Sequence, residues 1–213
     1  MRAITCSAAA ALVLVTTASS QTAPTAPSST PVHGLTIRAR IFDALPMLAK
    51  KYHVVIGLYG THIGHGSQPI EVSIKDGTLG EALDAIVREY PQVEWAQANN
   101  GAIHFTFRDS PISLFDVAVH SFDAESPGRT ETSGRLVRAP EVARWLQDHG
   151  CTISEMIVVV GQMHPPGEWG DFAVHARDAP VAAVFDEIAA KSGMYYWSAI
   201  KYNAQPCMIN VGF

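Results

Sequence analysis

The sequence has few of the features that mark nucleic-acid-binding or membrane-spanning proteins. Only 16% of its 213 residues are charged, and acidic residues outnumber Lys and Arg by 20 to 15. This acidic balance, with no cluster of basic residues, argues against a nucleic-acid partner. After residue 20, no apolar run reaches the length of about 20 residues that a membrane-spanning helix requires.

Motifs of common enzymes are also missing. The chain has no GxSxG elbow and no HExxH zinc motif, and its GTHIGHG segment lacks the Lys of a phosphate-binding loop. Of the nine histidines, His62 and His65 are the candidate metal ligands because they lie close together in one loop. Zinc normally requires three or four ligands. We therefore predict solvated histidines, no cofactor and no enzyme activity.

The N-terminus resembles an export signal. Residues 1–20 contain Arg2, an apolar stretch from Ala8 to Val15, and small residues before a cleavage point near Ser20 and Gln21. Residues 21–33 are rich in Pro, Ser and Thr, which predicts a disordered linker. The mature protein is expected to be periplasmic or secreted, and to contact the membrane only through the signal peptide before cleavage.

Two of the three cysteines remain after that cleavage, Cys151 and Cys207. An oxidising compartment favours a disulfide between them. Two separate buried thiols are the alternative, because the sequence does not show whether the two residues approach each other.

An internal repeat is the most informative feature that is present. Sliding the sequence by 102 positions aligns five identical residues without a gap: Val72 with Val174, Asp76 with Asp178, Asp84 with Asp186, Ile86 with Ile188, and Trp95 with Trp197. The same order of strand-like and helix-like patterns accompanies them. We therefore expect two similar units, residues 34–108 and a divergent copy at 114–213.

Hydrophobic periodicity predicts the elements of the first unit. A helix is expected at Ile41–Tyr52, followed by a buried strand at Val54–Tyr59 and an alternating strand at Ile70–Ile74. Thr78 and Glu81 form a capping box before the next helix, and an Asn-Gly turn joins two final strands. The expected fold class is α+β, with two helices and short strands in two small sheets per unit.

The second unit is expected to retrace this path with a longer polar loop. We predict a strand at Phe115–Ser121, a loop from Phe122 to Arg138, a helix beginning at Pro140 and a buried strand at Met156–Val160. Trp169 lies in a Pro/Gly loop and is the candidate partner contact.

The repeated polar residues have structural interpretations. Asp76 and Asp178 are expected to accept backbone hydrogen bonds at strand-to-helix turns. Asp84 and Asp186 are expected on solvated helix faces, where they would serve solubility.

The segment VSIKDGTLGEALDAIVREYPQVEWAQANNGAIHFTF, Val72–Phe107, resembles the short N-terminal (STN) domain of secretins and TonB-dependent receptors. The likeness lies in the helix start TLGEALD, the strand containing Trp95 and the Asn-Gly turn. It implies two helices between two small sheets in the periplasm of a double-membraned bacterium, and a function in binding an envelope protein.

Two functions therefore follow from the sequence. The first is an exported, non-catalytic protein–protein interaction module that uses an exposed sheet edge. The alternative is a small exported metal-binding protein or enzyme that uses His62, His65 and His164.

The signal peptide gives a direct test. Expressed in a double-membraned bacterium, the chain should reach the periplasm and begin at or near Gln21, because the apolar segment is long enough for signal recognition but too short for a stable anchor. Intact mass of the exported protein measures the cleavage point, and a variant lacking residues 2–20 should stay in the cytoplasm. An exported chain that keeps its N-terminal segment would contradict the assignment.

Overall fold

A computed structural model describes residues 26–62, 68–108, 112–126, 129–155, 172–202 and 207–213. It combines helices with short strands in small sheets, so the predicted α+β class is confirmed. The expected signal peptide, residues 1–20, lies outside the described residues.

Residues 26–108, called the first half, and residues 112–213, the second half, contain the following elements. The first half has η1 (Pro27–Ser29), β1 (Pro31–Ala39), α1 (Ile41–Tyr52), β2 (Ile56–His62), β3 (Ile70–Thr78), α2 (Leu79–Glu89), β4 (Val93–Gln97) and β5 (Ile103–Phe107). The second half has η2 (Ser113–Asp116), β6 (Ala118–Ser126), α3 (Arg129–Val137), α4 (Pro140–Asp148), β7 (Cys151–Glu155), β8 (Phe172–Pro180), α5 (Val181–Lys191), β9 (Tyr196–Tyr202) and β10 (Cys207–Gly212).

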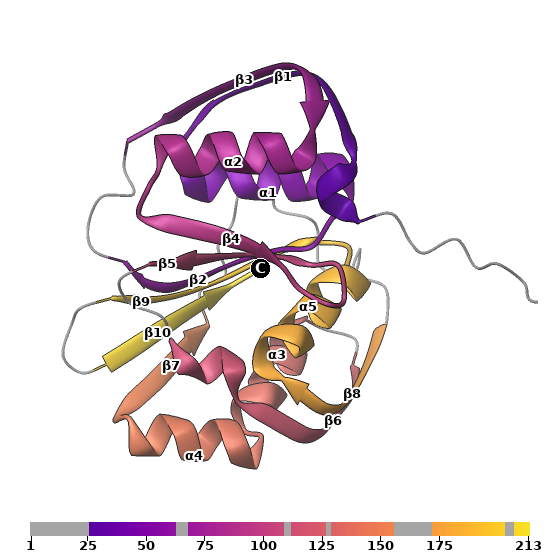
Figure 1. Ribbon diagram of the computed structural model, residues 1–213. Coiled ribbons are helices and arrows are strands. Elements are labelled where there is room, and N and C mark those ends of the chain that lie inside the picture. The colour runs from indigo at the N-terminus through magenta and orange to yellow at the C-terminus, as the bar shows by residue number, and fades with distance from the viewer. Residues whose placement is uncertain (1–25, 63–67, 109–111, 127–128, 156–171, 203–206) are drawn as a thin grey trace, which may run out of the picture.

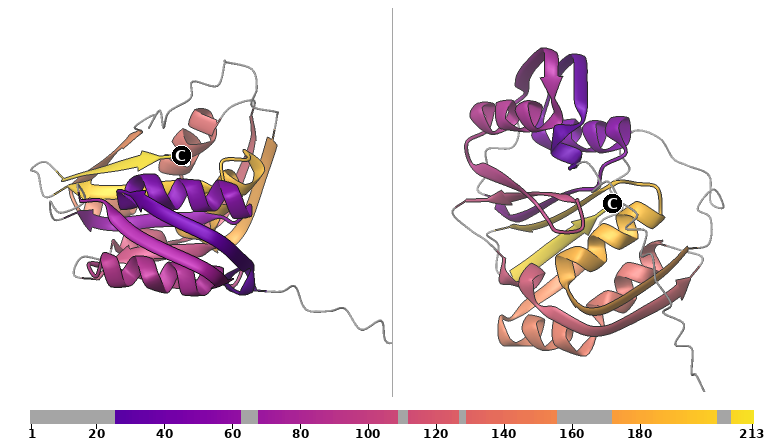
Figure 2. Two further views of the ribbon diagram at one scale, coloured as in Figure 1. Left: turned by 90° about the horizontal axis from the view of Figure 1, so that it is seen from above. Right: turned by 45° about the vertical axis from the view of Figure 1, so that its right-hand side comes forward.

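A six-stranded sheet runs through the middle of the molecule, in the order β4-β5-β2-β9-β10-β7. Two-stranded ribbons, β1-β3 and β6-β8, form the outer layers, and helices fill the space between each ribbon and the sheet (Figure 1). The further views show the same succession of layers (Figure 2). The inner strands of the two halves therefore belong to one sheet, joined where β2 pairs with β9, and the expectation of two separate small sheets in each unit is wrong.

The two halves contribute their strands in the same order but in opposite directions. β4 is antiparallel to β5, whereas β5, β2 and β9 are mutually parallel. β9 occupies the place in the second half that β4 occupies in the first, so the second half is turned over relative to the first. Its helices consequently cover the opposite face of the sheet (Figure 1).

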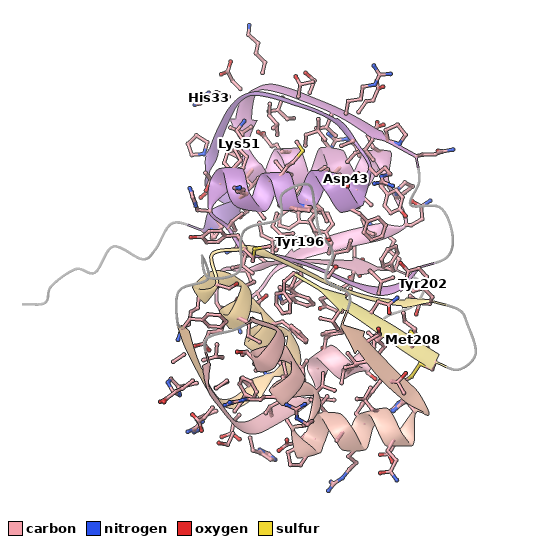
Figure 3. All side chains as sticks on the ribbon, turned by 180° about the vertical axis from the view of Figure 1, so that it is seen from behind. His33, Asp43, Lys51, Tyr196, Tyr202 and Met208 are labelled. Atoms are coloured by element: carbon pink, nitrogen blue, oxygen red, sulfur yellow. A yellow bond between two sulfur atoms is a disulfide. The ribbon has the colours of Figure 1, made fainter. Side chains whose placement is uncertain are left out.

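Two hydrophobic cores result, one on each face of the central sheet. Tyr196 and Ile200 of β9 belong to the core of the first half, whereas Trp197 and Ala199 belong to that of the second. Alternate residues of a strand point to opposite faces, so β9 is buried on both. Figure 3 shows Tyr196 inside the molecule, while Tyr202 lies at an end of the sheet.

Several local predictions are confirmed. α1 has the predicted bounds, and α2 begins with the predicted capping box, in which the Glu81 N–H donates to Thr78 Oγ1 at 3.2 Å. The Asn100-Gly101 turn joins β4 to β5, and Gly101 has a φ of 87°, which glycine adopts without the strain of a Cβ.

Three expectations are corrected. The predicted linker extended to residue 33, but β1 begins at Pro31, because Val32 is fully buried and ties this segment to the core. The predicted loop from Phe122 is occupied by the end of β6 and by α3, since β6 pairs with β8 over nearly its whole length. The turn predicted at Asp76 is part of β3, where Asp76 pairs with His33.

The strand predicted at Met156–Val160 lies outside the described residues. The strand that precedes it, β7, starts at Cys151 and forms a parallel pair with β10.

Gly57 is required at the junction between the halves. It pairs with Trp197, and a Cβ built on Gly57 would lie 2.5 Å from two carbon atoms of the indole. Trp197 is fully buried, so the ring has nowhere to move. The glycine therefore lets β2 approach β9 beneath the indole.

Gly57→Ala should lower the free energy of unfolding by about 1–3 kcal/mol, because the added methyl group overpacks a closed site. Urea unfolding measures the loss. In a Trp197→Phe background the same change should cost less, since the smaller ring leaves space, and the double-mutant cycle reports this coupling. Equal stability of Gly57→Ala and wild type would contradict the packing described here.

Candidate functional site

The same hydrogen bond occurs in both halves between a strand tryptophan and a helix aspartate. Trp95 Nε1 donates to Asp84 Oδ1 at 2.9 Å, and Trp197 Nε1 donates to Asp186 Oδ1 at 2.8 Å. These are the residues that the 102-residue repeat aligned. In each half the bond fixes the indole of the strand β4 or β9 against the helix that precedes it.

Asp186 is a buried carboxylate, contrary to the expectation that it would be solvated. Its exposed fraction is 3%. Besides the indole, Asn100 Nδ2 donates to it at 2.9 Å, and His104 Nε2 donates at 3.0 Å. These three donors explain how the charge is tolerated inside the protein, because buried carboxylates need hydrogen-bond partners. Asn100 and His104 come from the first half, so Asp186 links the two halves.

Its counterpart Asp84 remains exposed, as the sequence predicted. The exposure of the two aspartates differs because β2 pairs with one edge of β9, whereas no described strand pairs with the corresponding edge of β4. A signal for the bond was present in the sequence, since both aspartates precede their tryptophans by the same spacing. It was missed because the outward position of an acidic residue on a helix is the commoner arrangement.

Aromatic rings surround the Asp186 cluster. Tyr59 of β2 stacks on Trp197 with ring centroids 5.4 Å apart and planes 9° apart, and His104 meets Trp197 edge-on at 5.8 Å. Burial, together with the negative charges of Asp116 and Asp186, raises the pKa of Tyr59 to about 12. Tyr59 is therefore neutral at ordinary pH and acts here as an apolar surface.

A cleft of about 590 Å³ opens beside this cluster. Its walls include Asn100, Asp186, Ala183 and the ring pair of His53 and Tyr195. His53 and Tyr195 both have positive φ values, 50° and 58°. The arrangement places no nucleophile next to the His104–Asp186 pair among the described lining residues.

The repeated aspartates Asp76 and Asp178 bind histidines of the outer ribbons, and not backbone N–H groups as expected. His33 Nδ1 donates to Asp76 Oδ1, and His120 Nδ1 donates to Asp178 Oδ1, each at 2.9 Å. The hydrogen bond and charge of Asp178 raise the pKa of His120 above its ordinary value. Both pairs are exposed, so they contribute little to stability.

The outermost strand β4 has one free side. Backbone hydrogen bonds join β4 and its partner β5 at both ends of the hairpin. The Ala98 N–H donates to the Ala102 carbonyl at 2.8 Å, and the Arg108 N–H donates to the Gln92 carbonyl at 2.9 Å. Hydrogen-bonded and non-bonded pairs alternate in an antiparallel ladder. The even-numbered residues of β4 therefore point their backbone groups toward β5.

The odd-numbered residues Val93, Trp95 and Gln97 point their backbone groups away from β5. The Val93 N–H donates to the Tyr90 carbonyl at 3.3 Å, and the Val93 carbonyl accepts from Arg108 Nε at 3.1 Å. Within the described part of the chain, no strand pairs with this outer side. Trp95 is only partly buried there, while its counterpart Trp197 is fully covered.

Other residues singled out from the sequence have different outcomes. Cys151 and Cys207 form a disulfide that joins β7 to β10, with Cα atoms 4.5 Å apart. The side chain of His62 and all of His65, His164 and Trp169 lie outside the described residues. Among the described residues, no group of three or more His, Cys, Asp or Glu could hold a metal ion. No described helix is long and apolar enough to span a membrane.

Comparisons of the chain with protein-family models, curated proteins and solved structures gave no match.

The two Trp–Asp bonds provide a matched pair of variants. Asp186→Asn should lower the free energy of unfolding by about 2–4 kcal/mol, because the amide turns a donor toward other donors and removes a buried acceptor. Asp84→Asn, at an exposed site with one such partner, should cost about 1 kcal/mol or less. Chemical unfolding of both variants measures the difference, and equal losses would contradict the linking role of Asp186.

Proposed function

We propose that this chain is an exported, non-catalytic interaction module of the bacterial envelope that binds an extended strand of a partner protein at β4. The outward backbone groups of Trp95 and Gln97, with which no described strand pairs, are the observation that carries the proposal. An unpaired edge strand is a template for a further strand, and β-strand addition uses main-chain hydrogen bonds for affinity.

The side chains around β4 suit selective binding. Glu94 and Arg108 form an exposed ion pair at 3.5 Å, and charged side chains at an edge discourage indiscriminate pairing. Trp95 adds a partly exposed aromatic surface next to the free backbone, and aromatic residues often dominate binding energy.

We further propose that the chain consists of two copies of an STN-like unit. The repeated Trp–Asp bond, the repeated His–Asp bond and the equal strand order of the two halves support a duplication. The resemblance of Val72–Phe107 to the short domain of secretins and TonB-dependent receptors supports a partner in the envelope. The signal-like N-terminus supports export.

Site-specific photo-crosslinking in the native envelope tests the proposal. A photoreactive residue in place of Gln97 should give adducts with an envelope protein, because this position borders the free edge. The same residue in place of Glu71, on the exposed outer ribbon, is the matched control. Absence of adducts from position 97, or equal adducts from both positions, would contradict binding at β4.

A proline variant shows whether the backbone takes part. Gln97→Pro removes an outward N–H that no described strand uses, so adducts from a photoreactive residue at position 94 should disappear while the fold is kept. Gln97→Ala is its control, because it loses the Ser28 contact equally but retains the N–H. Circular dichroism checks that both variants are folded.

A further inference from the structure

The junction between β2 and β9 shows how a strand pairs next to a tryptophan whose indole is fixed by a hydrogen bond to a helix aspartate. β2 runs parallel to β9, and Gly57 lies opposite Trp197. The Ile56 N–H donates to the Tyr195 carbonyl at 2.9 Å, which fixes this register. Any side chain at position 57 would overlap the indole.

β4 presents the same receiving edge. Trp95 corresponds to Trp197, and its indole is held by the same bond to the equivalent helix aspartate. Tyr195, whose carbonyl accepts from the Ile56 N–H of β2, corresponds to Val93, whose carbonyl also points outward. There it accepts from Arg108 Nε at 3.1 Å, a side-chain hydrogen bond that an incoming strand would replace. The edge that β2 fills on β9 is thus repeated on β4 without an occupant among the described strands.

From this repetition we infer that the partner of β4 is a strand that runs parallel to β4 and carries a glycine opposite Trp95. The inference rests on the proposed function, which requires only that some strand binds there. It adds the direction, the register and the residue that the partner must have.

We expect the partner strand also to carry an aromatic side chain two positions after its glycine. In β2 this residue is Tyr59, on the same face as Gly57, and its ring stacks on Trp197. Alternate residues of a strand share a face. A Gly-x-Tyr sequence in the partner would therefore place an aromatic ring on the Trp95 indole and cover it.

A second copy of this chain does not fit the requirement. The edge strands of its central sheet are β4 and β7, the strand that corresponds to β2, and neither Val93–Gln97 nor Cys151–Glu155 contains a glycine. On the face of β4 that points away from α2, the charged Glu94 lies at the position of the buried Tyr196 in β9. A second copy that covered this face would bury that charge. No described edge strand of a second copy supplies the glycine, and the inferred occupant is a strand of a different protein.

A synthetic peptide of residues 54–62, VVIGLYGTH, is the probe, because it copies β2. Added to the full mature chain, it should shift the backbone amide and indole N–H signals of Trp95 in NMR spectra with a saturable dependence on concentration. The same peptide with Gly57→Val should bind at least about tenfold more weakly, because its side chain meets the indole.

A protein variant separates the glycine requirement from a general effect of the peptide change. With Trp95→Phe, the difference between the two peptides should shrink, since the smaller ring leaves space for the valine. Gln97→Pro should abolish binding of both peptides, and Gln97→Ala should not.

The outcomes distinguish the inference from the proposed function. Equal binding of both peptides to wild type at β4 would overturn the glycine requirement and leave strand binding at β4 intact. Binding of neither peptide, together with crosslinks from position 97, would overturn the β2-like register alone. Signal shifts at β9 in place of β4, or dimerisation of the chain through β4, would also overturn the inference.

Discussion

The parallel pairing of β2 with β9 is the interaction on which the rest of the structure depends. It joins strands from the two halves into one sheet, and because the second half is turned over, it buries both faces of the joined strands. Burial on both faces explains why the first five residues of β9, Tyr196 to Ile200, are buried. Solvent is excluded there, so Asp186 lies at the centre of a buried hydrogen-bonded cluster, whereas its counterpart Asp84 is exposed.

The same local device thus has two roles in one chain. In the first half, the Trp95–Asp84 bond lies at a surface and holds the indole against α2. In the second, the Trp197–Asp186 bond is enclosed, and Asn100 and His104 from the other half complete it. The difference comes from what covers the strand and not from the residues of the bond itself, which are identical.

Much of the local structure could be predicted from the sequence. The bounds of α1, the capping box of α2 and the Asn100-Gly101 hairpin follow from periodicity and turn chemistry, which depend on neighbouring residues only. The β2–β9 pairing could not be predicted, because hydrophobic patterns identify a buried strand but not its neighbour. Both strands looked equally suited to separate small sheets.

The sequence predicted the type of candidate site but not the strand that forms it. An exposed sheet edge was expected, but which strand would be outermost depends on the strand order, and no single residue encodes that. The burial of Asp186 was missed for the same reason, since it depends on contacts with β5 and its turn. The partly exposed position of Trp95 was not predicted, because it follows from the lack of a described strand on the outer side of β4.

The wide separation of β2 and β9 along the chain has a kinetic consequence. Ile56 pairs with Tyr196, so the central sheet cannot close until the chain has been synthesised at least as far as β9. Until then β2 has a bare edge of its own, and contacts between such distant residues slow folding. The central sheet should consequently form late, and in the interval the unpaired edge of β2 is open to pairing with other strands.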